Sequence, residues 1–129
     1  MPSRQQTRTF KTARFSKNAK KANIDDAELC KAIEQVMLGQ ADDLGGGVYK
    51  KRLNDNLHRS IVLAKGGKYW IYEYLFAKKS QNNIEDAELI AFRLLAKSYA
   101  GLTEHQVSQL LATRDFVEIC HDDKTEIQK

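Results

Sequence analysis

Lysine and arginine residues crowd into the stretch from Val48 to Lys79, where eight of them accompany only two acids. The eight are Lys50, Lys51, Arg52, Arg59, Lys65, Lys68, Lys78 and Lys79. Arginine forms a planar clamp for phosphate, and a lysine among other cations loses its proton more easily and so becomes a general base. In RNA, a base that takes the proton of a 2′-hydroxyl lets that oxygen attack the neighbouring phosphate. The cluster therefore predicts RNA binding, with cleavage by this metal-independent route.

Four of these cations form the predicted catalytic set. Lys50 and Arg52 point to the same face of one strand because side chains alternate along a strand. Arg59 begins the next strand, and Lys79 follows the third. Five further residues are predicted to bind RNA: Lys51, Lys65, Lys68, Lys78 and His58. The same cations also suit a protein that holds phosphates and catalyses nothing, and this alternative stays open.

A three-stranded meander is expected to carry these cations. Its strands are predicted from β-branched and aromatic runs over Tyr49–Leu53, His58–Ala64 and Tyr69–Ala77. Between the first two lie Asn54-Asp55-Asn56, residues that tolerate a left-handed backbone. Lys65-Gly66-Gly67-Lys68 is a hairpin signal between the second and third strands. Connections this short make the three strands antiparallel.

The residues before the meander predict one strand and two helices. Thr9–Phe15 is expected to be extended, and Ser16 is expected to cap a short helix. A longer helix is predicted from about Asp25 to Leu38, with Asp25 as its N-cap. Gln40–Gly47 is expected to be a loop.

Two further helices are predicted after the meander. The first spans Asp86–Tyr99 and ends at Gly101, and Tyr99 lies on its apolar stripe and is assigned to the core. Thr103 and Gln106 form a capping box for the second. Residues 116–119 are either a short strand or an extended tail. The predicted fold class is α+β, in the order β-α-α-β-β-β-α-α, with helices on one face of an antiparallel sheet.

Length and composition limit the class of protein. A chain of 129 residues, 42% of them hydrophobic, is expected to form one domain over residues 9–120. Residues 1–8 are expected to be a flexible basic tail and residues 121–129 a polar one. No apolar run approaches the roughly 18 residues that a membrane span needs, and no apolar leader opens the sequence. A cytoplasmic protein without membrane contact is therefore predicted.

The cysteines and histidines give no sign of a cofactor site. Cys30 and Cys120 form no CxxC motif, so both are predicted to remain unpaired thiols in a reducing compartment. The histidines share no metal-ligand spacing with them, and no metal or other cofactor is predicted. The three glycines at 45–47 lack the frame of a nucleotide-binding loop, which leaves nucleotide binding as a minor alternative.

Two motifs carry a resemblance to a known family. These are LGGGVYKKR at residues 44–52 and LFAKKSQNNI at residues 75–84. With their order and spacing, roughly residues 8 to 120 resemble the RelE/HigB group of bacterial toxin–antitoxin toxins, within the RelE/ParE superfamily. The resemblance implies a microbial-RNase-like fold and cleavage of mRNA in the ribosomal A site. It also implies a cognate antitoxin as partner, often a helix-turn-helix protein.

The resemblance also implies roles for individual residues. The family's tyrosine-lysine-arginine strand falls on Tyr49, Lys50 and Arg52, its next arginine on Arg59, and its later basic residue on Lys79, or on Lys78 if the register shifts by one. This chain departs from the family pattern at two places: the loop before Arg59 is shorter than is usual in the family, and Lys79 stands where the family has an arginine. A non-catalytic member that binds nucleic acid or inhibits gyrase, like the ParE branch, is the alternative function.

Overall fold

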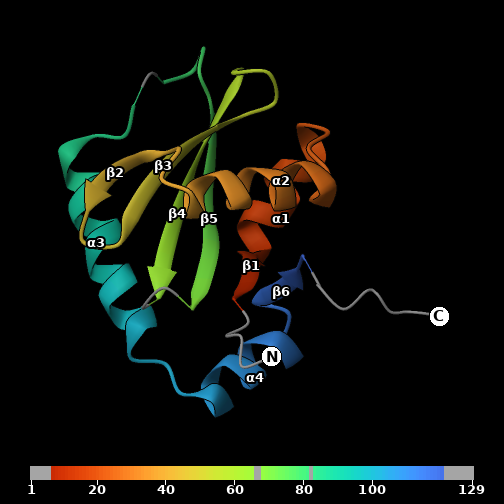
Figure 1. Cartoon of the computed structure of the whole chain (residues 1–129), viewed down its shortest axis with the longest axis vertical. Coiled ribbons are helices and arrows are strands. Elements are labelled where there is room, and N and C mark those ends of the chain that lie inside the picture. The colour runs from red at the N-terminus through yellow and green to blue at the C-terminus, as the bar shows by residue number, and fades with distance from the viewer. Residues whose placement is uncertain (1–6, 66–67, 82, 121–129) are drawn as a thin grey trace.

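The computed structural model describes residues 7–65, 68–81 and 83–120. These residues form a six-stranded sheet in the order β2-β3-β4-β5-β1-β6, with helices on both of its faces (Figure 1). The strands are β1 (Arg8–Thr12), β2 (Asp42–Gly45), β3 (Val48–Leu53), β4 (His58–Lys65), β5 (Tyr69–Ala77) and β6 (Phe116–Ile119). The helices are α1 (Ala13–Lys21), α2 (Asp26–Met37), α3 (Asp86–Ala100) and α4 (Glu104–Ala112).

The α+β class is confirmed, but two details of the predicted architecture are wrong. The sheet is mixed, because β1 runs parallel to β5 while the other strand pairs are antiparallel. The helices lie on both faces rather than one. The reason is the continuous apolar run in β4: Val62 packs with α1 and α2, whereas Ile61 and Leu63 pack with α3 on the other face. Strands apolar on both faces need cover on both sides.

The first strand is shorter than expected. Thr12, not Ser16, caps α1, and its hydroxyl accepts a hydrogen bond from the backbone N–H of Phe15 at 3.1 Å. Extended structure therefore ends three residues before the predicted boundary at Phe15. The expected cap of α2 is confirmed, since the Asp25 carboxylate accepts from the Glu28 backbone N–H at 3.0 Å.

The second half of the chain follows the prediction more closely. Gly101 ends α3, and the capping box of Thr103 and Gln106 begins α4. Residues 116–119 form β6, which pairs antiparallel with β1. The expected loop at Gln40–Gly47 instead contains β2, which pairs with β3 at the edge of the sheet. The predicted hairpin glycines at 66 and 67 lie outside the described residues, as do the tails at 1–6 and 121–129.

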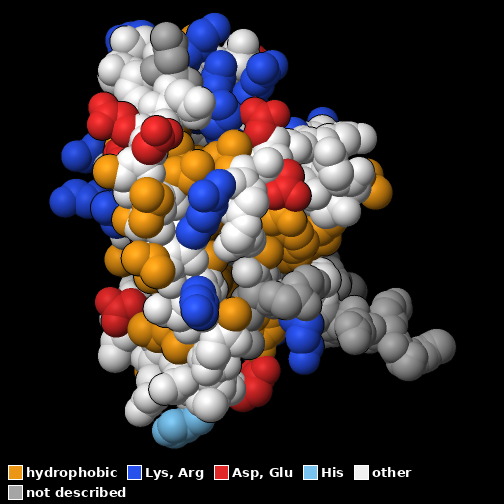
Figure 2. All heavy atoms as spheres, turned by 90° about the vertical axis from the view of Figure 1, so that its left-hand side faces the viewer, with side chains coloured by type: hydrophobic (Ala, Val, Ile, Leu, Met, Phe, Trp, Pro, Cys, Tyr) orange, Lys and Arg blue, Asp and Glu red, His pale blue; other side chains and the backbone are white. Residues whose placement is uncertain are grey.

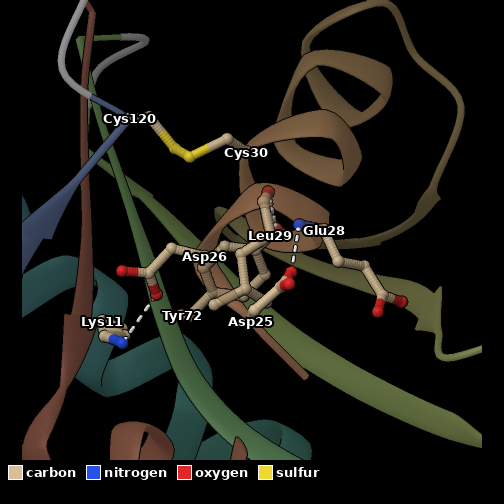
Figure 3. The surroundings of a disulfide bond; sticks show 8 residues. All are labelled: Lys11, Asp25, Asp26, Glu28, Leu29, Cys30, Tyr72 and Cys120. Atoms are coloured by element: carbon tan, nitrogen blue, oxygen red, sulfur yellow. Dashed lines mark hydrogen bonds and ion pairs between the residues drawn. A yellow bond between two sulfur atoms is a disulfide. The ribbon is translucent and has the colours of Figure 1, made fainter. Parts of the chain in front are cut away.

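A disulfide joins α2 to the residue after β6, so the prediction of two unpaired thiols is wrong. Cys30 and Cys120 are bonded, with their Cα atoms 5.4 Å apart (Figure 3). The antiparallel pairing of β6 with β1 places Ile119 and Cys120 against the core cluster that includes α2. The spacing of the two cysteines in the sequence does not reveal this contact. Among the described residues, no helix has the length and apolar character that crossing a bilayer requires.

Candidate nucleic-acid interface

Two arginines face each other across β3 and β4. Arg52 is the register partner of Arg59, and Arg59 is in turn the partner of Phe76 on β5. Residues directly opposite one another in an antiparallel pair point to the same face, so both arginines lie on the face that α3 covers in part. Lys50 is two residues from Arg52 and shares this face. Like charges directly opposite each other destabilise a sheet, which a bound anion would relieve.

Arg59 is held in place by the turn before it. Only 7% of this residue is exposed, and its Nη1 donates to the backbone carbonyls of Asn56 at 3.0 Å and His58 at 3.3 Å. Asn54, Asp55 and Asn56 all have a left-handed backbone, with φ of 56°, 53° and 72°, as their residue types predict. The turn thereby aims two backbone carbonyls at Nη1 of the guanidinium and fixes one edge of it.

The same turn is tied to α2. The Glu28 carboxylate accepts a short hydrogen bond from the backbone N–H of Asn54, and the Asn54 side chain reaches the carbonyl of Ala22 at 3.5 Å. Leu57 closes the turn, since its N–H donates to the Asn54 carbonyl at 3.0 Å. Helix α2 therefore helps to position Arg59 through the backbone of the turn.

Lys50 is oriented by two neighbours that the sequence does not point out. Its Nζ donates to Oδ1 of Asn83 at 3.2 Å and forms an ion pair with Asp42 at 3.6 Å. Asp42 comes from the unpredicted strand β2, and Asn83 from the segment before α3. The Lys50 side chain is only 15% exposed, so these contacts hold its ammonium group close to the sheet.

Lys51 points to the opposite face of the sheet. It alternates with Lys50, and its Nζ donates to the carbonyl of Gln40 at 3.2 Å. Burial lowers the pKa of Lys51, and the charge of Arg52 lowers it further. The lysine with the lowered pKa is therefore Lys51 and not the predicted base, Lys50. Lys51 lies on the face of the sheet that carries α1 and α2.

A groove lies beside the start of β4 and the end of β5, on the α1 side. It has a volume of about 640 Å³ and contains His58, Lys78 and Lys79 from the predicted set. Lys21, Ala22, Leu57 and Ala77 complete its lining. His58 follows the face of its register partner Leu53, which packs with α1 and α2, whereas Arg59 faces α3. The predicted residues are therefore divided between the two faces of the sheet. His58 lies on the face of α1 and α2, in the groove that Lys78 and Lys79 also line, and Arg59 lies on the face of α3.

The two remaining predicted cations lie at the other end of the sheet. Lys65 ends β4, and its side chain is outside the described part of the structure. Lys68 is exposed and precedes β5, whereas Lys78 and Lys79 follow β5. Nine strand residues separate the two ends, which corresponds to about 30 Å. Lys68 therefore cannot share a phosphate with Arg59.

A buried carboxylate on this sheet was not predicted as functional. Glu73 has no register partner on β4, because the β4–β5 register shifts between Ile61 and Val62. Its carboxylate accepts a hydrogen bond from the Tyr99 hydroxyl at 2.7 Å. Arg14 approaches the other carboxylate oxygen at 3.4 Å. Burial raises the pKa of Glu73, which the bond from Tyr99 and the charge of Arg14 partly offset. A lone acid within an aromatic strand was the only signal in the sequence.

Tyr99 fills the core role assigned to it. Its ring packs edge-on against Phe116, with the ring centres 5.4 Å apart, and its hydroxyl is engaged by Glu73.

A family model covers nearly the whole described chain. The model described as RelE toxin of the RelE/RelB toxin–antitoxin system matches residues 7–119. Neither the curated proteins nor the solved structures contain a match. The matched range begins before β1 and ends with β6, so it includes every element that positions the two arginines.

Proposed function

Because the chain belongs to the RelE toxin family of toxin–antitoxin systems, we propose that it poisons translation by cutting mRNA on the ribosome in the cytoplasm. As a family member it has an antitoxin as its partner, and we propose a helix-turn-helix protein for that role.

One observation carries the proposal: the pair of Arg52 and Arg59, opposite each other on neighbouring strands. Two guanidinium groups on one face repel each other until an anion lies between them. A phosphodiester fits this need, because guanidinium donors match phosphate oxygens and lose little on leaving water. The burial of Arg59 strengthens its attraction for an anion by excluding solvent.

The reaction needs three roles. We assign Lys50 as the base that takes the proton from the 2′-hydroxyl, and the two arginines as the groups that stabilise the charge on the phosphorane. The bond from the 2′-oxygen to phosphorus forms while the bond from phosphorus to the 5′-oxygen breaks. Lys79 is assigned as the acid that gives a proton to that leaving oxygen, and its side chain must reach the arginines around the end of β5 from the groove on the α1 side. The products are a 2′,3′-cyclic phosphate and a 5′-hydroxyl.

The groove beside β5 extends the proposed contact with RNA. Three lysines line this groove, Lys21, Lys78 and Lys79, together with His58 and the apolar residues Ala22, Leu57 and Ala77. Lysines bind phosphates as point charges, and an apolar floor accepts the face of a base. We assign this groove to the nucleotides next to the scissile bond. Lys51 would add positive charge on the opposite face of β3. The ends of β4 and β5 that carry positions 65 and 68 lie too far from the two arginines to share their phosphate.

The test compares single variants in a translating extract, with mRNA 5′ ends mapped after a timed reaction. Arg52→Ala is the clean variant because the Arg52 side chain is exposed, and among the described residues it forms none of the side-chain hydrogen bonds or ion pairs that hold Arg59 and Lys50. We expect it to slow cleavage by about 100-fold, as loss of one donor to a developing charge does elsewhere. Lys68→Ala removes another exposed cation, at the far end of the sheet, and should cleave at the wild-type rate.

Two results would refute the proposal. Intact mRNA with the wild-type protein present would leave binding without cleavage, which is the gyrase- or nucleic-acid-binding alternative. Equal loss of cleavage in Arg52→Ala and Lys68→Ala would show that net charge alone matters. Lys50→Ala and Lys79→Ala, assayed beside them, separate the proposed base and acid from the phosphate clamp.

A further inference from the structure

The outer face of α3 carries a second apolar stripe. Ala87, Ile90, Ala91 and Leu94 repeat at the spacing that places side chains on one side of a helix, and all four are exposed. Ile90 is 57% exposed and Leu94 63% exposed. Figure 2, which views the molecule from the α3 side, shows hydrophobic side chains gathered along this face. The inner face of α3 packs on the sheet, so the outer stripe serves no purpose in the core of the chain.

Opposite charges stand at the two ends of this stripe. Asp86 lies one turn before Ile90, and Lys97 lies just under one turn after Leu94. Both are exposed, and within the described part of the chain neither forms an ion pair. Arg93 on the flank is already engaged, because its guanidinium donates to the carbonyl of Leu44. The stripe is therefore acidic at one end, apolar in the middle and basic at the other end.

We propose that this stripe is the contact between two copies of the chain, packed as antiparallel α3 helices about a two-fold axis. A surface with opposite charges at its two ends is complementary to itself when it is turned end over end. In that arrangement Ile90 of each copy packs on Leu94 of the other, and Asp86 of each approaches Lys97 of the other. Antiparallel helix dipoles add to the attraction. The small side chains of Ala87 and Ala91 allow the helices to pack closely.

The contact is small, which sets its strength. One helix pair buries less than the roughly 1,200 Å² of a stable complex, so the dimer forms reversibly at high protein concentration. None of the cations assigned to RNA takes part in it. The proposal therefore stands or falls separately from the proposed cleavage of mRNA.

Sedimentation equilibrium of the oxidised protein, from about 10 µM to about 1 mM, tests the proposal. The wild type should dimerise reversibly in this range. Leu94→Glu should remain monomeric throughout, because it buries a charge at the centre of the contact. Leu38→Glu is the matched control, since Leu38 is 75% exposed at the end of α2, and it should dimerise as the wild type does.

Charge exchange tests the orientation of the two helices. Asp86→Lys and Lys97→Glu should each weaken the dimer about fivefold, because each places like charges together at two symmetric positions. The double variant Asp86→Lys/Lys97→Glu should recover the wild-type association. A wild type that stays monomeric to the highest concentration overturns the proposal, as does a dimer that Leu94→Glu leaves intact. Failure of the double variant to recover the wild-type association also overturns the proposal. Exclusive binding of an antitoxin helix at Leu94 would assign the stripe to that partner instead.

Discussion

Reduction of the disulfide is expected to remove a large part of the stability of this protein. The bond between Cys30 and Cys120 closes a loop with a sequence separation of 90 residues. The loss of chain entropy in the unfolded state scales with the logarithm of that number and corresponds to about 4.6 kcal/mol at 25 °C. A domain of this size has a total free energy of unfolding of about 5–15 kcal/mol. The reduced protein should therefore be folded but much less stable.

Denaturation in urea, with and without a thiol reductant, measures this difference directly. The oxidised wild type should unfold at a higher urea concentration than the reduced wild type. Its free energy of unfolding should be larger by about 3–5 kcal/mol. A Cys30→Ala/Cys120→Ala variant is the control and should match the reduced wild type in both buffers. Equal midpoints for oxidised and reduced wild type would refute the reasoning, as would two free thiols counted in the protein purified without reductant.

Two further predictions concern the turn and the buried carboxylate. Asn56→Ala should lower the free energy of unfolding by about 1 kcal/mol in thermal melts, because alanine resists its φ of 72°, and Asn56→Gly should cost less; equal losses would contradict this. Glu73 has a pKa raised above its ordinary 4.5, so the folded protein binds the proton more tightly than the unfolded chain. The contribution of Glu73 to the free energy of unfolding is therefore full below pH 4.5 and is lost as pH rises through the raised pKa. Glu73→Gln should abolish that loss in urea titrations at several pH values. An unchanged dependence of the free energy of unfolding on pH in this variant would contradict the prediction.

Local signals predicted the parts of the fold that local chemistry decides. Tyr69–Ala77 is a strand with the predicted bounds, and the three residues from Asn54 to Asn56 form the left-handed turn. Asp25 and Thr103 cap their helices, because a side chain and a backbone N–H three residues away are enough to make a cap.

Contacts between distant residues account for what the sequence did not reveal. Thr12 and Ser16 are both favourable caps in isolation. The pairing of β1 with β5 and β6 stops at Lys11 and Thr12, and this tertiary pairing selects Thr12. The edge strand β2 has a polar sequence, and only its pairing with β3 extends it. The disulfide likewise depends on where β6 lies beneath α2.

The candidate site was predictable to the extent that strand alternation governs it. Alternation placed Lys50 and Arg52 on one face, and the short turn allowed Arg59 to oppose Arg52. The same rule separates His58 from Arg59. The partners of Lys50 come from segments far away in the sequence, which no local pattern connects to it.

The chemical identity of the RNA ends tests the central claim most directly. Messenger RNA cut by the wild-type protein on ribosomes should carry a 2′,3′-cyclic phosphate on the upstream fragment and a 5′-hydroxyl on the downstream fragment, as mass spectrometry of both can establish. Arg52→Ala should give the same ends about 100-fold more slowly. A 3′-hydroxyl with a 5′-phosphate, or mRNA that stays whole, would contradict a 2′-hydroxyl attack supported by the paired arginines.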